Sequence, residues 1–245
     1  EGLLDKFAAI QSGESVSTRK ADGIPVGVGL HDSSAALIPY LYAFTEPFIL
    51  LSTGTWSISL NPFNHSPLTE QELMQDCLCY LSFQGKPVKA SRLFAGHDHE
   101  AFIKKLSVHF QCAADHYLSV IPDQQIIDKW WLADDEEIAG IFSGINYLSS
   151  YDETYHAGMI HLLRLQKKST ELVLGSGRIK NIFVDGGFSK NRVFMKLMAR
   201  SFPEMELYAA SLAQASSLGA ALSIHHHWNK KGLPGNLLEL KRYLI

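Results

Sequence analysis

Three short polar motifs, each at the end of an apolar run, constrain the fold and chemistry of this chain most. GLHD occupies residues 29–32, STGTWS occupies 52–57, and VDGG occupies 184–187. In turn they supply a carboxylate, a turn rich in hydroxyl groups, and a diglycine on which a ligand can lie against bare backbone. Ligand-facing groups of open α/β sheets gather at strand ends, so the three motifs together predict one wall of a binding site.

Alternating strands and helices are predicted around these motifs. In chain order we expect a buried strand, a helix, two hairpins and three helices: 24–30, 31–43, 48–51 with 56–60, 77–83 with 88–94, 98–110, 123–131 and 152–174. A final strand, helix, strand and helix are expected over 182–184, 189–202, 206–209 and 212–228, which is typical of parallel βαβ units. The pattern predicts an α/β fold with a mixed sheet.

Composition limits the partners of the chain. Its 245 residues can bury a full core, and a net charge of −3 without a basic block gives nucleic acid no electrostatic support. The apolar stretches are far shorter than a membrane span, so neither nucleic acid nor membrane is expected as a partner. The cysteines, Cys77, Cys79 and Cys112, are sparse and odd in number, which favours a reducing, cytoplasmic compartment.

The first residues look like a connection from another domain. Residues 1–10 have the pattern of a helix end, and the polar stretch 11–23, with several glycines and serines, is typical of a linker. We therefore expect 1–23 to be a helix end and linker from an amino-terminal domain, and 24–245 to form one compact domain.

Asp32 admits two roles. A carboxylate between a strand and a helix can orient a substrate hydroxyl and accept its proton during phosphoryl transfer, which depends mainly on positioning. The commoner role at this position is an N-cap that accepts the backbone N–H of Ser34 or Ala35.

The two glycine-containing turns also have alternatives. In the turn around Gly54, hydroxyls and converging backbone N–H groups can bind a phosphate, although a plain hairpin turn has the same composition. Gly186 and Gly187 can admit a nucleotide before a helix N-terminus, or can serve a turn that needs positive φ.

Other conspicuous residues fit structural roles better. Cys77 and Cys79 lack a second ligand pair at zinc spacing, His97-Asp98-His99 is typical of a helix start, and His225–His227 of a helix end. No metal site is predicted.

Several segments resemble the carboxy-terminal domain of the FGGY family of carbohydrate kinases. They are IPVGVGLHDSSAALIPYL, FILLSTGTWSISL, IFVDGGFSKNRVFMKLMA and SLGAAL, and the likeness is specific over 24–60 and 181–224. The resemblance implies an actin-like ATPase (RNase H-like) fold, with a mixed sheet flanked by helices, and ATP-dependent phosphorylation of a sugar hydroxyl between two such domains. The His-Asp pair and STGTWS look most like the rhamnulokinase and fuculokinase branch, which acts on deoxy-ketoses.

By motif, the resemblance assigns roles to individual residues. Asp32 matches the general base, flanked by His31 and Ser33 as sugar contacts. The expected ATP contacts are Gly54, Thr55, Gly186, Gly187 and Asn191. The chain departs from the family pattern over 96–100 and 158–161 and at Gln214.

The resemblance also implies ligands and partners. ATP and a small-molecule sugar, a ketose or deoxy-ketose, are the expected substrates. Mg²⁺ is expected mostly through the nucleotide and an amino-terminal domain, since no phosphate loop of that domain occurs in this sequence. An isolated carboxy-terminal half is expected to be inactive, and a homodimer is compatible with the pattern.

Two other functions remain open. A non-catalytic actin-like module for regulation or assembly would share the fold. A metal-dependent hydrolase on an RNase H-like sheet would need several carboxylates at strand ends, where the sequence offers Asp32 and Asp185.

Overall fold

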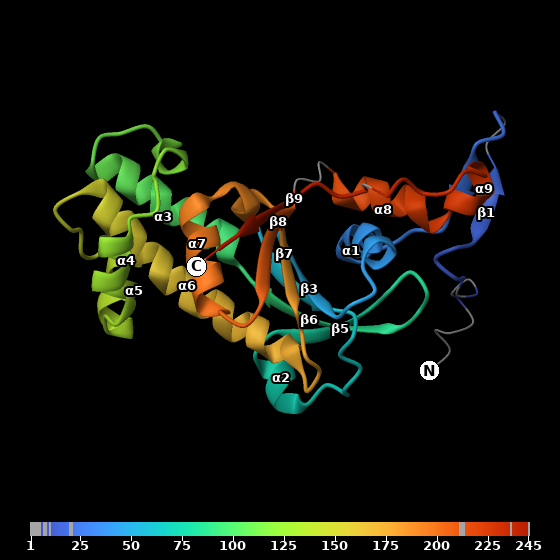
Figure 1. The fold of residues 1–245 in the computed structure, drawn as a ribbon, viewed down its shortest axis with the longest axis horizontal. Helices are drawn as coiled ribbons and strands as arrows, with labels where there is room; N and C mark the ends of the chain where they lie inside the picture. The colour runs from blue at the N-terminus through green and yellow to red at the C-terminus, as the bar shows by residue number, and fades with distance from the viewer. Residues whose placement is uncertain are drawn as a thin grey trace.

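A mixed sheet of seven strands forms the centre of the part of the chain that the structure describes (Figure 1). The computed structural model describes residues 6, 9, 11–19, 22–210, 214–235 and 237–244. Across the sheet the order is β5 (Cys77–Leu81), β6 (Pro87–Leu93), β4 (Ser57–Asn61), β3 (Phe48–Thr53), β7 (Asn181–Gly186), β8 (Glu206–Ala210) and β9 (Leu240–Tyr243). β3, β7 and β8 run parallel, and the other neighbouring pairs are antiparallel.

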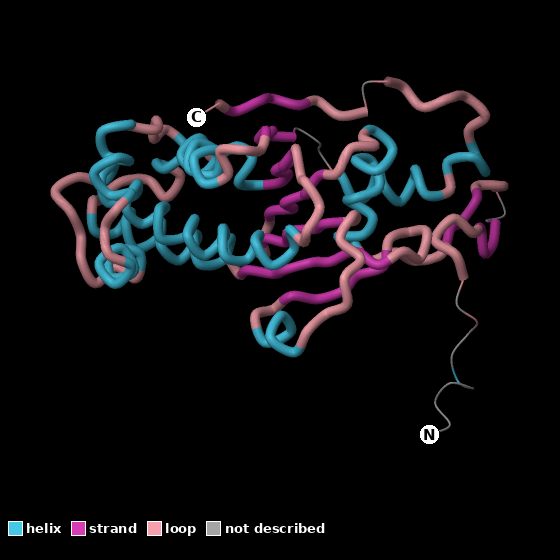
Figure 2. Tube along the Cα trace, turned by 60° about the horizontal axis from the view of Figure 1, so that its bottom comes forward, coloured by secondary structure: helices cyan, strands magenta, loops and turns pink. Residues whose placement is uncertain are grey.

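Helices cover both faces of this sheet. They are α1 (Asp32–Ala43), α2 (Glu70–Met74), α3 (Ala95–His109), α4 (Gln124–Trp131), α5 (Asp135–Phe142), α6 (Tyr151–Leu174), α7 (Arg192–Ser201), α8 (Ala215–Ser223) and α9 (His225–Trp228), with 3-10 turns at His116–Leu118 and Gly187–Lys190. Figure 1 shows α3, α4 and α5 gathered at one end of the molecule and α1, α8 and α9 at the other. Figure 2 shows the long helix α6 running from the helical end of the molecule to the strands. Within the described ranges, no helix combines the length and apolarity needed to cross a membrane.

The central strand β3 explains the layered arrangement. Its side chains alternate between the two faces, and nearly all of them are buried. Ile49 and Leu51 belong to a core shared with α6 and α7, whereas Phe48 and Leu50 belong to a second core with α1. A strand buried on both faces must be apolar along its whole length, and β3 is apolar until Ser52.

Most of the predicted elements are confirmed. Both hairpins, β3 with β4 and β5 with β6, occur as antiparallel pairs, and β7–α7–β8 forms the expected parallel unit. The helices predicted over 31–43, 123–131 and 152–174 agree with α1, α4 and α6 to within one residue at each end.

The first predicted strand is wrong in its length and surroundings. Only Pro25–Gly27 (β2) is extended strand, and it pairs with β1 (Val16–Arg19) in a separate two-stranded sheet. Ile24 is 56% exposed, so the run 24–30 is not a buried strand. Gly27 and Gly29 give this run little side-chain area to bury in a core. The polar stretch 11–23, expected to be a linker, contains β1, while the helix end expected over 1–10 lies almost entirely outside the described residues.

Other differences concern the ends of helices. α3 starts at Ala95 rather than at residue 98, and the described part of the last predicted helix is divided into α8 and α9 at Ile224. α7 starts at Arg192 because Asn191 caps it and the four residues before Asn191 form a 3-10 turn. The short elements β9, α2 and α5 have no counterpart among the predictions.

Helices α1 and α8 pack at backbone contact, which generates a prediction. A Cβ added to Gly219 of α8 would lie 1.7 Å from the carbonyl oxygen of Ala35 in α1. Gly219→Ala must separate the two helices, and we expect it to lower the free energy of unfolding by about 1–3 kcal/mol, measured by urea denaturation. Gly177→Ala is the matched control, since a Cβ there meets no atom within 4 Å. Equal stability of the two variants would contradict this account of the packing.

Candidate functional site

Two neighbouring cavities, which share Gly54, contain all but one of the predicted site residues. The first, here called the Asp32 cavity, has a volume of about 430 Å³ and is lined by His31, Asp32, Ser33, Ser52, Thr53, Gly54, Thr55, Trp56, Ile58, Tyr80 and Arg92. The second, called the diglycine cavity, measures about 290 Å³ and is lined by Gly54, Gly96, His99, Glu100, Ile103, Tyr117, Gly187, Phe188 and Asn191. The fold thus brings the sequence motifs to one continuous surface.

The N-terminus of α1 presents Asp32 to its cavity. His31, not Asp32, is the N-cap, and its ring Nδ1 accepts from the backbone N–H of Ser33 at 3.3 Å. Asp32 is the first helical residue, and its carboxylate accepts from the same N–H at 2.7 Å. The predicted cap to Ser34 or Ala35 is therefore wrong, because the helix begins one residue earlier than such a cap requires. The Asp32 side chain remains 81% exposed and free to meet a ligand.

The turn between β3 and β4 is held in place by α3. Within the turn, the Gly54 N–H donates a hydrogen bond of 2.8 Å to the Trp56 carbonyl. The N–H of His97 donates to the Thr55 carbonyl at 3.1 Å, and a Cβ on Gly96 would lie 1.8 Å from the Gly54 oxygen. Only glycine at position 96 lets the helix start lie this close to the turn.

Aromatic and basic side chains complete the Asp32 cavity. The Trp56 ring contacts the Phe94 ring, with centroids 4.5 Å apart, and the Arg92 guanidinium, 5.2 Å from the indole centroid. Asp76 holds Arg92 through a 2.7 Å ion pair, while Tyr80 packs against His31 with ring centroids 5.0 Å apart. The cavity therefore joins a carboxylate, a cation and aromatic surface.

The two glycines of the diglycine turn have different roles. Gly186 has φ of 85°, and a Cβ there would lie 1.8 Å from the Thr53 carbonyl oxygen. A Cβ added to Gly187 would meet no atom within 4 Å, so the bare face of this residue is open to the diglycine cavity. Gly186 is required by the backbone, and Gly187 leaves room for a ligand.

Thr53 locks this turn to the neighbouring strand. Its hydroxyl donates to the Asp185 carbonyl oxygen and accepts from the Phe188 N–H at 3.0 Å. The parallel register explains the contact, because it pairs Thr53 with Gly186. Thr53 is buried, and the hydroxyl satisfies two backbone groups that would otherwise have no partner there.

Asn191 is buried behind the diglycine turn. Its Oδ1 caps α7 by accepting from the Phe194 N–H at 3.1 Å, and its Nδ2 donates to the Tyr155 hydroxyl at 2.7 Å. Both ends of the amide are therefore already bonded within the protein.

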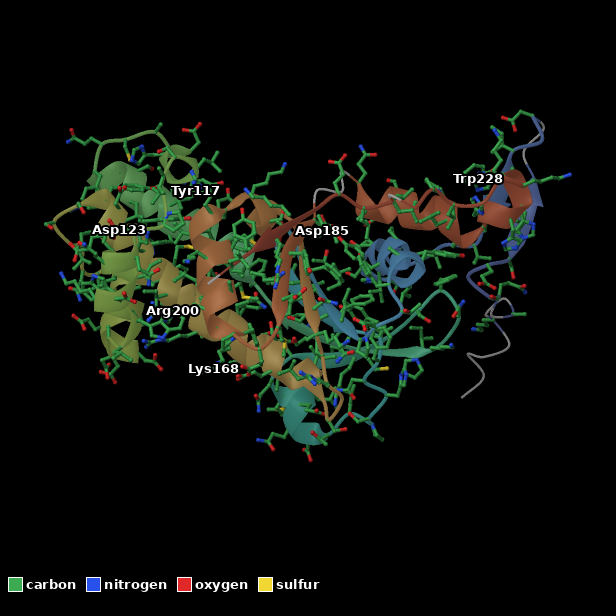
Figure 3. The ribbon with its side chains drawn as sticks, in the orientation of Figure 1. Tyr117, Asp123, Lys168, Asp185, Arg200 and Trp228 are labelled. Carbon is green, nitrogen blue, oxygen red and sulfur yellow. The ribbon has the colours of Figure 1, made fainter. Side chains whose placement is uncertain are left out.

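Asp185 is a buried carboxyl beneath the site. Figure 3 shows it at the end of the central strands, between the helical end of the molecule and α8. It is 6% exposed, and burial raises the pKa of its carboxyl, although the Gly186 N–H and Tyr40 favour the charged form. Burial, followed by the Asp185 charge, in turn raises the pKa of the Tyr40 phenol.

The sequence alone does not assign several cavity residues to the site. Tyr80 and Arg92 come from β5 and β6, which no motif connects to the turns. The segment 96–100 is noted in the sequence as a helix start and as a departure from the family pattern, yet Gly96, His99 and Glu100 line the diglycine cavity. Position at the end of a strand hairpin is the one available signal for Arg92. Among the described residues no group of His, Cys, Asp and Glu could hold a metal ion.

Comparison with known proteins gives one family. A family model described as the C-terminal domain of the carbohydrate kinase FGGY matches residues 45–231. A search of curated proteins found no match.

Solved structures show the same fold. A carbohydrate kinase from Novosphingobium aromaticivorans matches with a TM-score of 0.69 and 22% identity, over 99% of this chain and 54% of that one. Gluconate kinase from Lactobacillus acidophilus matches with a TM-score of 0.66 and 13% identity, over 96% of this chain and 52% of that one. Plasmodium falciparum glycerol kinase with ADP matches with a TM-score of 0.59 and 16% identity, over 89% of this chain and 48% of that one. The expected actin-like α/β fold is confirmed, and the chain spans about half the length of these structures.

The Thr53 hydroxyl can be tested by an isosteric change. Thr53→Val leaves the Phe188 N–H and the Asp185 carbonyl without their partner, and we expect it to lower the free energy of unfolding by about 1–3 kcal/mol. Thr53→Ser keeps the hydroxyl, and its free energy of unfolding should fall clearly less. Urea denaturation measures both, and a valine variant as stable as the serine variant would exclude the hydroxyl as the cause.

The raised pKa of Asp185 has a pH signature. Because the folded state disfavours the charged carboxyl, stability from this group is present at low pH and lost as the pH rises through its folded pKa. Asp185→Asn keeps an acceptor for the Gly186 N–H and should therefore be more stable than the wild type near pH 7. Its advantage should shrink as the pH falls through the raised pKa of the wild-type carboxyl, which then takes up a proton in the folded state. Urea denaturation over a series of pH values from 7 downward measures this, and an advantage of the asparagine variant that grew on acidification would contradict it.

Proposed function

Because the chain belongs to the FGGY carbohydrate kinase family, of which it carries the carboxy-terminal domain, we propose that it forms the nucleotide-binding wall of a sugar kinase. In this proposal the γ-phosphoryl group of ATP passes to a sugar hydroxyl in a cleft that an amino-terminal domain completes. The observation that carries the proposal is that the Asp32 cavity and the diglycine cavity meet at Gly54.

Asp32 is the proposed general base. The Ser33 N–H holds one carboxylate oxygen, and the exposed remainder can accept the proton of a sugar hydroxyl in the Asp32 cavity. Phosphoryl transfer needs such a base to be well placed more than strongly basic. His31 and Ser33 flank it as proposed sugar contacts, and Arg92 adds a positive charge to the same cavity.

The nucleotide is proposed to lie across the shared turn. Gly54 and Thr55 would contact its phosphates, and the open face of Gly187 would admit the adenosine part. Gly186 would act through the backbone, and Asn191 by holding the helix behind the turn. Residues of this chain offer no ready magnesium ligand set among those described, so Mg²⁺ would arrive with the nucleotide and be held mostly by the other domain.

The substrate is proposed to be a ketose or deoxy-ketose, as in the rhamnulokinase and fuculokinase branch. The His31-Asp32 pair and the motif STGTWS support this choice, and His31, Asp32 and residues 52–56 line the Asp32 cavity together with Tyr80. Aromatic surface beside a carboxylate suits a sugar with both an apolar edge and a reacting hydroxyl. We propose a cytoplasmic location, where ATP is available.

The isolated chain is proposed to bind nucleotide weakly and to be inactive. One wall cannot exclude water or hold a sugar hydroxyl in line with the phosphoryl group. Isothermal titration of the 245-residue chain with ATP and magnesium should give weak heats that saturate in the millimolar range. Absence of any binding by a folded chain would favour the alternative, a non-catalytic actin-like module.

The base role predicts a selective loss of turnover. In the full-length protein, Asp32→Asn should reduce kcat on a panel of ketoses and deoxy-ketoses by about 10²–10⁴-fold, because the proton acceptor is lost. ATP affinity should stay within about twofold, since Asp32 faces the sugar side. Asp152→Asn, an exposed carboxylate at the start of α6, is the matched control and should leave kcat unchanged. Full activity of Asp32→Asn would remove Asp32 from this role.

A further inference from the structure

A buried hydrogen-bonded chain of three side chains stands behind the diglycine cavity. It links His99 of α3, Tyr155 of α6 and Asn191 at the cap of α7, whose exposed fractions are 6%, 0% and 5%. The Tyr155 hydroxyl lies 2.7 Å from Asn191 Nδ2 and 3.0 Å from His99 Nε2. No ion pair involving these three is present within the described part of the chain, so hydrogen bonds are the polar contacts that link them.

The donor and acceptor of each hydrogen bond among these three side chains can be assigned by starting from Asn191. Asn191 Oδ1 caps α7, so its Nδ2 must be the group that donates to the Tyr155 oxygen. The single Tyr155 proton then has one acceptor within the described residues, His99 Nε2. If His99 Nε2 carried a proton, the buried phenol proton would be left without a partner, which is costly. The proton of neutral His99 therefore resides on Nδ1.

This Nδ1–H has no hydrogen-bond partner in the described structure. The fully buried side-chain atoms without a partner there are Tyr40 Oη, Ser57 Oγ, Arg92 Nε, Tyr151 Oη and Gln166 Oε1. His99 Nδ1 is not among them, so it keeps accessible surface, and His99 lines the diglycine cavity. The Tyr117 and Phe188 rings pack against the imidazole in edge-to-face geometry, with ring centroids 5.0 and 5.3 Å away.

We infer that His99 is a nucleotide-binding residue that presents a neutral Nδ1–H to a phosphate or ribose oxygen in the diglycine cavity. This inference rests on the proposed nucleotide-binding function. His156 differs, because both of its ring nitrogens are bonded within the protein, to the Asp123 N–H and to the Asp152 carbonyl. Burial lowers the pKa of His99 to about 4, so the ring stays a neutral donor at physiological pH. Glu100, which lines the same cavity, is the nearby acidic group that faces the ligand side.

The tautomer can be observed directly. Long-range proton–nitrogen NMR spectra of the ¹⁵N-histidine-labelled chain distinguish Nδ1–H, Nε2–H and imidazolium forms, and His99→Leu identifies the His99 signals among the 11 histidines. We expect the Nδ1–H form at pH 7. Tyr155→Phe removes the hydroxyl that selects it and should give a mixture of tautomers, which also tests the inference should His99→Leu not fold. Tyr151→Phe is the matched control, because its buried hydroxyl has no partner among the described residues and should leave His99 unchanged. An Nε2–H or imidazolium form in the wild type would overturn the inference.

Binding is tested with ADP and with adenosine as separate probes. Both probes should shift the NMR signal of the Gly187 amide. The probe that carries the oxygen bonded by His99 should also shift the NMR signal of His99 Nδ1. A shift with ADP alone assigns a phosphate oxygen, and a shift with both assigns the ribose. His99→Leu should weaken the affinity for ADP by about 5–10-fold, the loss expected for one neutral hydrogen bond.

The outcomes separate the two proposals. If ADP shifts Gly187 while His99 Nδ1 and the affinity of His99→Leu are unchanged, nucleotide binding stands and the role of His99 is overturned. If ADP shifts neither residue at millimolar concentration, the nucleotide-binding function itself fails, and the role of His99 fails with it.

Discussion

The parallel pairing of β3 with β7 is the constraint on which the site depends. It places Thr53 opposite Gly186 and Ser52 opposite Asp185, although these residues are more than 130 positions apart. The Thr53 hydroxyl can then bond both sides of the diglycine turn, and the absence of a Cβ at Gly186 lets the two backbones touch. A register shift of one residue would turn Thr53 to the other face and remove both contacts.

Close backbone approach is used again around this pairing. Gly96 brings the start of α3 against Gly54, and Gly219 brings α8 against α1. Each contact fixes the position of a turn or helix that borders a cavity. Supports held in this way keep ligand contacts in place without a further ordering cost on binding.

The polar groups of the site differ in how far they are buried. Asp32 is exposed at a helix N-terminus, where its charge is favourable, whereas Asp185 is buried without a basic partner within hydrogen-bond reach among the described residues. His99 is buried and neutral beside Tyr155. The two cavities therefore differ in their polar lining: the Asp32 cavity is lined by Asp32 and Arg92, and the diglycine cavity by His99 and Glu100.

Local patterns in the sequence determined much of this protein. Apolar runs with flanking turns predicted the hairpins, the long helix α6 and the parallel unit around α7, because burial and the α-helical or β period act over a few residues. The motifs around Asp32, Gly54 and Gly187 were also recognisable, since strand ends in such folds are where glycine and polar residues gather. The prediction of a buried strand over 24–30 was wrong. Its apolar residues resemble those of a core strand, but Gly27 and Gly29 leave little side-chain area to pack.

Tertiary structure decided the rest. Which of Gly186 and Gly187 opens onto a cavity, what the Thr53 hydroxyl bonds, and how Arg92, Tyr80 and His99 reach the cavities all depend on strand register and helix placement. The proton on His99 depends on Asn191 through Tyr155, a chain of bonds between three helices. No local pattern encodes such relations, because they arise from contacts between residues distant in sequence whose distances only the packed fold defines.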